Sequence, residues 1–401
     1  MELEARTRWR IVVILICTGI VSSFQVGKIP GAIPILRENF GISLFAASWI
    51  ISLLTIIGAL AGVVLGAFGD RIGYRRLIRI GLSLLILGCF LGGFAPSIGL
   101  LFLSRFIEGI GFFFTVLSAP SLITRIVHPK HLRLILGIWG AYMPTGIALM
   151  VFISPPIMNN IGWRGLWYLN GMICLLILIL FIIATRNLSN EQVLLTRKQI
   201  HIQHNVIKTV SAPGPLLLAL CFLCYAGQWM ALVNFLPTFF IESLGSDKGS
   251  AAIFTALAVV SNIPGNITGG WLSQKNIPRW ILLSFSFTAV MLTTFGIYSN
   301  DTTQSARLIF LLLFSFTGGI IPGTLMAGVP SHSPGKECLG TTNGFISQGS
   351  NLGTLLIPPA LAVVVSATGG WNGASWLFAI AGSIGILSSL GIRKLEATIK
   401  L

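Results

Sequence analysis

Three ionisable residues lie within long apolar stretches of the sequence, where a charge is costly and usually serves a function. Arg105 and Glu108 are three positions apart, so on a helix their side chains lie on the same face. Glu108 is the deepest carboxylate in apolar sequence and therefore the candidate for reversible protonation and proton coupling. Together with Lys28, the set carries a charge of +1, and surplus positive charge in an apolar cleft favours an anion. Lys28 and Arg105 are the candidate anion ligands.

Each of these residues also has a structural explanation. Arg105 and Glu108 can form a neutral pair that locks the N-terminal half and never titrates. Lys28 can extend its long side chain toward the membrane interface. Pro30 and Pro34 follow Lys28, so we expect a broken helix with freed carbonyl groups there. The sequence leaves the functional and structural explanations open.

Uncharged polar side chains within apolar segments are candidates for hydrogen bonds to a substrate, because amides and indoles place donors at modest burial cost. The alternative is that they hold neighbouring helices together. The candidates are Gln25, Tyr142, Gln228, Trp229, Asn234, Asn262 and Gln348.

The sequence shows no cluster of residues suited to catalysis or metal binding. The five histidines lie at segment ends or in a polar interval, and none has metal-ligand spacing with carboxylates. The six cysteines mostly lie in apolar segments, where a thiol behaves as a small hydrophobic group. We therefore expect no enzyme activity, no metal and no cofactor.

The composition of the chain indicates that the candidate residues lie on helices in a lipid bilayer. The chain has 401 residues, of which 54% are hydrophobic and 9% charged, whereas soluble domains carry about 25% charged residues. The formal charge of +15 does not indicate nucleic-acid binding, because most basic residues lie in alternate short loops, as the positive-inside rule requires. This pattern predicts an all-α polytopic protein of the bacterial inner (plasma) membrane with both termini in the cytoplasm.

Hydropathy predicts twelve transmembrane segments of roughly 20 residues or more. They are 9–34, 44–68, 77–94, 98–127, 132–154, 164–185, 213–241, 249–272, 279–298, 305–330, 339–366 and 373–392. The polar interval after Thr185 predicts three parts: an N-terminal six-helix bundle (1–185), a cytoplasmic linker (186–212) and a C-terminal six-helix bundle (213–401).

An internal repeat supports this division. A shift of about 203 residues superposes Gln25 on Gln228 and Pro34 on Pro237, and a shift of 202 superposes Arg105 on Arg307. Pseudo-symmetric halves of this kind are typical of transporters whose substrate site lies between them.

Two motifs resemble the major facilitator superfamily. The loop Gly66-Ala-Phe-Gly-Asp70-Arg71-Ile-Gly73-Tyr-Arg75-Arg76 is similar to its signature between the second and third helices, with Tyr74 as the departure. Arg105-Phe-Ile-Glu108-Gly109-Ile-Gly111 is similar to its fourth-helix motif. The segment Gly27 to Arg37 resembles the cyanate/nitroimidazole-type and nitrate-type anion porters.

The resemblance implies a conformational latch in which Asp70 faces the start of the eleventh helix and a basic residue that ends the fourth, here Arg125. The latch residues are Gly66, Asp70, Arg71, Gly73, Arg75, Arg76 and Arg125. An anion at a helix start beside an arginine is stabilised by the helix dipole, and it must be released when the halves move.

The sequence thus predicts a secondary active transporter of a small inorganic or organic anion that works by rocker-switch alternating access and is coupled to protons. The alternatives are a drug or metabolite/proton antiporter for efflux and, less favoured, a receptor with a transporter fold. The expected partners are a small-molecule substrate, protons and the lipid bilayer, not nucleic acid, and the expected state is a monomer.

Overall fold

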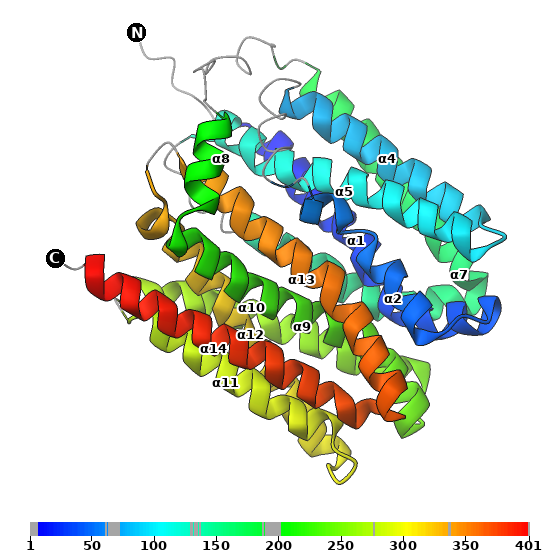
Figure 1. Ribbon diagram of the computed structural model, residues 1–401. Helices are drawn as coiled ribbons and strands as arrows, with labels where there is room; N and C mark the ends of the chain where they lie inside the picture. Colours follow the sequence, from blue (N-terminus) through cyan, green and yellow to red (C-terminus); the bar gives the residue numbers. More distant parts are fainter. Residues whose placement is uncertain are drawn as a thin grey trace. The chain divides into compact units, whose positions relative to one another are not determined.

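The computed structural model describes residues 7–60, 62, 73–128, 131, 135, 138–186, 188, 202–275, 277–335 and 338–399. These residues form helices and connecting turns, without a β-strand in the described ranges. The chain divides into two compact units. Unit 1 contains residues 1–40 and 64–200, and unit 2 contains residues 41–63 and 201–401 (Figure 1).

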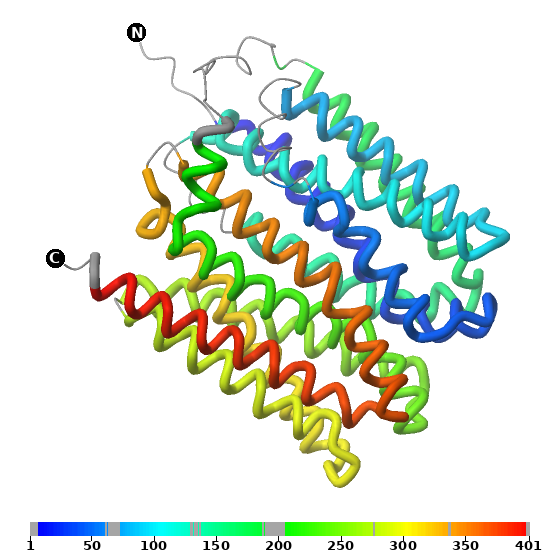
Figure 2. Tube along the Cα trace, viewed as in Figure 1, coloured from blue at the N-terminus to red at the C-terminus, as the bar shows by residue number. Residues whose placement is uncertain are grey.

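Unit 1 is built from long apolar helices. They are α1 (Trp9–Phe40), α4 (Tyr74–Phe94), α5 (Ile98–Ile126) and α7 (Tyr142–Thr185). Helix α1 packs mainly on α7, and α4 packs on both α5 and α7. In Figure 2, α4 and α5 run side by side and are joined by a short turn.

Unit 2 contains the remaining helices. They are α2 (Leu44–Ser52), α8 (Ile202–Val210), α9 (Pro213–Leu244), α10 (Lys248–Gln274), α11 (Arg279–Tyr298), α12 (Gln304–His332), α13 (Leu339–Thr368), the 3-10 turn η3 (Trp371–Gly373) and α14 (Ala374–Ile399). Helix α9 packs on α13, and α11 packs on α12 and α14. The pairings α1 with α7 and α9 with α13 are the same kind of contact in the two units.

The described helices confirm the predicted all-α polytopic fold. Ten of them are long and apolar enough to cross a membrane. Helix α7 has 44 residues, about 66 Å at 1.5 Å per residue, which is twice the roughly 30 Å thickness of the hydrocarbon core. Its course breaks at Gly162, whose φ of 70° lies in the left-handed region. Helix α7 therefore covers the predicted segment 132–154 from Tyr142 onward and the whole of segment 164–185, with a break at one glycine between them.

The predicted segment 44–68 differs from its expected continuous form. Helix α2 ends at Ser52, and the Thr55 N–H then donates to the Ser52 carbonyl at 3.0 Å, a tighter i to i−3 turn. This segment packs on α13 within unit 2. The division into 1–185, 186–212 and 213–401 was drawn from continuity in sequence and stays a prediction.

Close backbone approach holds the helices of unit 2 together. A Cβ on Gly265 of α10 would overlap the carbonyl oxygen of Phe316 on α12, and one on Gly353 of α13 would overlap that of Leu223 on α9. Glycine at these points lets the helices approach closely where lipid provides no hydrophobic driving force between helices.

Candidate functional site

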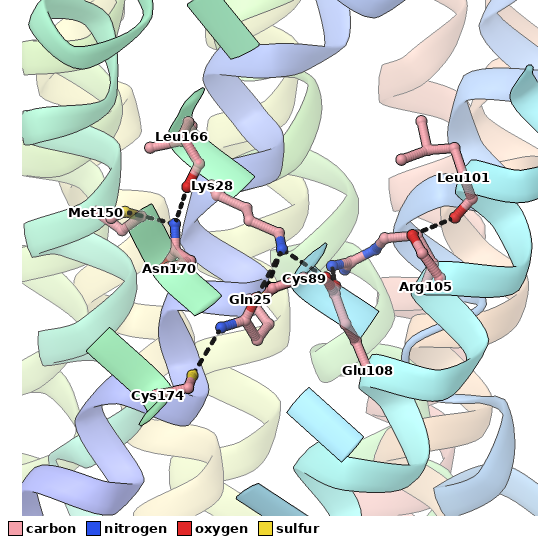
Figure 3. A network of polar contacts seen from close by, with 11 residues as sticks. Gln25, Lys28, Cys89, Leu101, Arg105, Glu108, Met150, Leu166, Asn170 and Cys174 are labelled. Carbon is pink, nitrogen blue, oxygen red and sulfur yellow. Dashed lines mark hydrogen bonds and ion pairs between the residues drawn. The ribbon is translucent and has the colours of Figure 1, made fainter. Parts of the chain in front are cut away.

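The centre of the candidate site is the ammonium group of Lys28, in the middle of α1. Its side chain has an exposed fraction of 0%, so it does not extend to the membrane interface. Lys28 Nζ donates to Glu108 Oε1 at 2.7 Å and to Gln25 Oε1 at 2.6 Å. Figure 3 shows Lys28 extending from α1 toward Glu108 on α5. The structure thus joins the two helices through a buried ion pair.

Arg105 completes the charged set from the other side of Glu108. It lies one turn before Glu108 on α5, and its Nη1 donates to Glu108 Oε2. Each carboxylate oxygen therefore accepts from a different cation. The predicted association of Lys28, Arg105 and Glu108 is present in unit 1, and their buried charges sum to +1.

Thiols and an indole surround the Lys28 ammonium on its remaining sides. Cys89 Sγ of α4 lies 3.7 Å from Lys28 Nζ and donates to Gln25 Oε1 at 3.2 Å. Gln25 Nε2 donates to Cys174 Sγ of α7 at 3.6 Å. The centroid of the Trp167 ring lies 4.4 Å from Lys28 Nζ, a cation–π contact.

We call these seven residues the Lys28 network. They are Gln25, Lys28, Cys89, Arg105, Glu108, Trp167 and Cys174.

Two glycines on α4 explain why this network fits between packed helices. A Cβ on Gly88 would overlap the side chain of Glu108, and a Cβ on Gly92 would overlap the ring of Trp167. Because these glycines are four residues apart, they open one face of α4. The sequence of α4 thus makes room for a carboxylate from α5 and an indole from α7.

The charges of the network are buried and close together. Breaking a buried ion pair by removing one partner costs about 3–5 kcal/mol, because the other charge is left without compensation. Here two cations share a single carboxylate, so the three charges sum to +1 when Lys28 is protonated. An added monoanion would make the network neutral.

The candidate residues of unit 2 have other contacts. Gln228 Nε2 donates to the Cys224 carbonyl at 2.9 Å, and Asn234 Nδ2 donates to the Met230 carbonyl at 2.8 Å. The remaining amide oxygen of each is buried, with no hydrogen-bond partner among the described residues. Each of these two amides therefore offers an acceptor, and its predicted role as a donor stays a prediction.

Trp229, Asn262 and Gln348 hold helices together within unit 2. Trp229 Nε1 donates to Ser315 Oγ at 3.1 Å. Asn262 Nδ2 donates to the Tyr225 hydroxyl at 2.8 Å and to the Ser315 carbonyl at 2.9 Å. Gln348 Nε2 donates to the Ala59 carbonyl at 2.7 Å. These contacts agree with the alternative of helix packing, and a substrate role for them stays a prediction.

Tyr142 lies at the start of α7, where its ring stacks on Trp139 with the centroids 4.6 Å apart. A Cβ on Gly19 of α1 would overlap the Trp139 ring. The structure therefore places Tyr142 in an aromatic contact beside α1, and its predicted role in binding is untested.

The predicted latch is described only in part, because Gly66, Asp70 and Arg71 lie outside the described residues. Gly73 precedes α4 with a φ of 88°. Arg75 Nη1 donates to the Leu188 carbonyl at 2.9 Å, and Arg76 is exposed.

Arg125 has an unexpected aromatic partner in the same region. Its guanidinium lies 4.7 Å from the centroid of the Tyr74 ring. Tyr74 is the residue at which the loop departs from the family motif, so this departure supplies a cation–π partner for the basic residue near the end of α5.

Arg307 does not occupy the position in α12 that Arg105 occupies in α5. Arg105 is the eighth residue of α5 and Arg307 the fourth of α12, one turn nearer the helix start. Arg307 donates to the Ile297 carbonyl at 2.8 Å and to the Ser299 carbonyl at 2.6 Å. It satisfies carbonyl groups at the end of α11, which explains its burial without a ligand.

The sequence analysis missed the roles of Cys89, Cys174 and Trp167. Thiols and indoles are common in apolar helices, so their types gave no signal, although the polar Gln25 one turn before Lys28 marks the same face of α1. Another missed group joins α11, α12 and α14, where Arg279 forms an ion pair with Glu396 and His332 Nε2 lies 3.8 Å from Glu396 Oε1. No group of three or more potential metal ligands occurs among the described residues.

Comparison with known proteins gives consistent matches along the chain. The family model "Major Facilitator Superfamily" matches residues 15–358. The chain is 26% identical over 378 residues to a probable nitrate transporter, NarT, of Staphylococcus epidermidis, covering 92% of each chain. It is 28% identical over 324 residues to a nitrite extrusion protein of Bacillus subtilis, covering 80% of this chain and 79% of that one.

Two further matches extend over almost the entire chain. A probable sulfoacetate transporter, SauU, of Cupriavidus necator is 23% identical over 421 residues, covering 98% of this chain and 96% of that one. The crystal structure of a bacterial homologue of the human lysosomal transporter Spinster has a TM-score of 0.79 at 15% identity, covering 98% and 99% of the two chains. At this identity the structural match shows the fold alone.

Proposed function

This chain belongs to the major facilitator superfamily, and on that premise we propose that it is a secondary transporter of a small inorganic or organic anion. It is a multi-pass membrane protein. The observation that carries the proposal is the buried set of Lys28, Arg105 and Glu108, which has a charge of +1 when Lys28 is protonated. The relatives' names add support, since nitrate, nitrite and sulfoacetate are all small anions.

The proposed anion site is built on the two cations of the Lys28 network. The anion accepts hydrogen bonds from Lys28 and Arg105 beside those that Glu108 accepts in this structure. Both cations and the carboxylate then keep a partner, which avoids the cost of leaving a buried charge unpaired. The free amide oxygens of Gln228 and Asn234 are proposed as acceptors for a donor on an organic substrate.

The wider proposal keeps the properties expected from sequence. The protein works as a monomer in a bacterial plasma membrane, with both termini in the cytoplasm, by rocker-switch alternating access coupled to protons. The latch around Asp70 controls that movement. An efflux antiporter for cationic drugs is not favoured, because the buried charge has the wrong sign for a cation.

The proposal is tested by transport into liposomes that contain the purified protein. Uptake of nitrate, nitrite and short organic anions is measured with an imposed pH gradient. We expect uptake of at least one of these anions, and its loss in Lys28→Met and Arg105→Met. Lys248→Met, which removes an exposed lysine at the start of α10, is the matched control and should transport normally. Intact anion uptake in both Lys28→Met and Arg105→Met would show that the proposed site is wrong.

A further inference from the structure

The hydrogen bonds around Lys28 distinguish one of its protons from the other two. A lysine ammonium has three N–H donors, and two short bonds, to Gln25 and Glu108, use two of them. The remaining neighbours of Nζ are the weak acceptor Cys89 Sγ, at 3.7 Å, and the Trp167 ring. An uncharged amine keeps two N–H donors and therefore keeps both short bonds.

The other charged members of the network are poorly placed to carry a proton. Arginine remains protonated in proteins, so Arg105 cannot release one. Glu108 accepts from Lys28 on one oxygen and from Arg105 on the other. A proton on either oxygen would remove the negative charge that holds both cations. The sequence analysis assigned proton coupling to Glu108, and this geometry gives Glu108 the role of a fixed counter-ion.

The thiols are the remaining titratable groups near Lys28. Cys89 of α4 donates to Gln25 Oε1, and Cys174 of α7 accepts from Gln25 Nε2. Both thiols therefore position the side-chain amide of Gln25 through hydrogen bonds. Helix α7 also presents Trp167, which carries no titratable proton in water. Among the described neighbours of Lys28, the ammonium itself is the group whose proton can leave without loss of a short hydrogen bond.

We propose that Lys28 is the proton carrier, and that its proton and a monovalent anion are carried together. This inference rests on the proposed function. It adds the residue that couples anion transport to protons and the charge of the transported anion. With an uncharged Lys28 amine, Arg105 and Glu108 balance and the empty network is neutral. With a Lys28 ammonium and a bound monoanion, the network is neutral again.

Charge balance couples the movement of the proton to the movement of the anion. A buried uncompensated charge costs several kcal/mol, so the states with a proton alone or an anion alone are disfavoured. The two neutral states are the ones in which the protein changes conformation. A dianion would leave the protonated network with a net charge of −1, so the site selects monoanions such as nitrate or a monocarboxylate.

The first test measures protons directly and does not depend on transport. Anion is added to the purified protein in weakly buffered detergent solution containing a pH indicator. Because anion binding and Lys28 protonation are linked, we expect uptake of about one proton per bound anion where Lys28 is initially uncharged. Lys28→Arg, whose side chain stays charged, should bind the anion without proton uptake.

The second test separates exchange from net transport in liposomes. Lys28→Arg should exchange labelled for unlabelled anion, yet fail to accumulate anion when a pH gradient is imposed. Lys248→Arg is the matched control, because it makes the same change on an exposed lysine, and it should accumulate anion as the unaltered protein does.

The results distinguish this inference from the proposed function. Wild-type protein that binds none of the anions would overturn both. Anion binding without proton uptake, or proton uptake that persists in Lys28→Arg, would overturn the Lys28 assignment alone. If Lys28→Arg does not fold, as judged by thermal unfolding, Lys28→Met replaces it. Proton uptake on anion binding by Lys28→Met would equally overturn the assignment.

Discussion

Gln25 and Lys28 lie one turn apart on α1, and the side-chain amide oxygen of Gln25 accepts from the Lys28 ammonium at 2.6 Å. Because Gln25 also contacts Cys89 and Cys174, it connects the charged residues to α4 and α7. The amide is neutral, so it orients Lys28 without compensating its charge.

Replacing this amide by a carboxylate should weaken anion binding. Gln25→Glu keeps an acceptor for Lys28 but adds a negative charge, which balances the Lys28 ammonium in place of the anion. We expect the affinity for the transported anion to fall about tenfold or more, since a buried charge contact is worth roughly 1.5–3 kcal/mol. Isothermal titration calorimetry measures the affinity. Gln304→Glu, at the exposed start of α12, is the control and should bind normally. Unchanged affinity in Gln25→Glu would contradict the anion site.

Arg307 should contribute to stability and not to binding. Arg307→Met removes the donors for the carbonyls of Ile297 and Ser299 at the end of α11. We expect a loss of about 2 kcal/mol in the free energy of unfolding, because hydrogen bonds to charged groups are worth roughly 1.5–3 kcal/mol. Denaturation in detergent measures the loss. The anion affinity of the folded variant should be unchanged, and a tenfold weaker affinity would place Arg307 in the site after all.

Gly265 should not tolerate a methyl group. In Gly265→Ala the new Cβ would overlap the Phe316 carbonyl, so α10 and α12 must separate. We expect a lower free energy of unfolding by about 1–3 kcal/mol, as for other overpacked contacts. Gly270→Ala on the same helix is the matched control, because nothing lies within 4 Å of its added Cβ. It should be neutral or stabilising by up to about 1 kcal/mol. Equal thermal unfolding of the two variants would disprove the close contact.

Asp247 should stabilise α10 in a pH-dependent way. Its carboxylate caps the helix by accepting from the N–H groups of Gly249 and Ser250. Hydrogen bonds from Ser250, with a smaller contribution from Gly249, lower the pKa of Asp247. The stabilisation from ionisation is therefore present at neutral pH and is lost as the pH falls through the lowered pKa.

Thermal unfolding of Asp247→Ala and Asp247→Asn, compared with the unaltered protein, measures this effect. The difference from Asp247→Ala should shrink as the pH is lowered from 7 to about 3, below the ordinary aspartate pKa of about 3.9. Asparagine also caps helices and does not titrate, so Asp247→Asn should keep its capping at both pH values. A constant difference for Asp247→Ala would show that ionisation of Asp247 contributes nothing.

Hydropathy and turn signals were sufficient to predict most helices. The predicted segment 279–298 has the bounds of α11, and most other limits fall within a few residues. Sequence could not show that α2 ends at Ser52, because the tightening near Thr55 depends on how the chain packs against α13. The gap between the predicted segments 132–154 and 164–185 contains Gly162, but hydropathy could not show that the helix continues on both sides of this residue.

The charged part of the candidate site was predictable, and its surroundings were not. Lys28 and Glu108 stand out because ionisable residues are rare in apolar segments. Their contact depends on how α1 packs against α5, which no local pattern specifies. The repeat matched Arg105 with Arg307 by residue type, although the helix starts put them one turn apart. Residue identity alone cannot distinguish an arginine that holds a carboxylate from one that completes a helix end.

The contact between Trp167 and Lys28 gives the protein its own optical probe. An indole ring centred 4.4 Å from an ammonium experiences the electric field of that charge directly, and its emission depends on this field. Light emitted by Trp167 therefore reports whether Lys28 is charged. With the other tryptophans replaced by phenylalanine, this signal follows the chemistry of the buried amine in real time and without an attached dye.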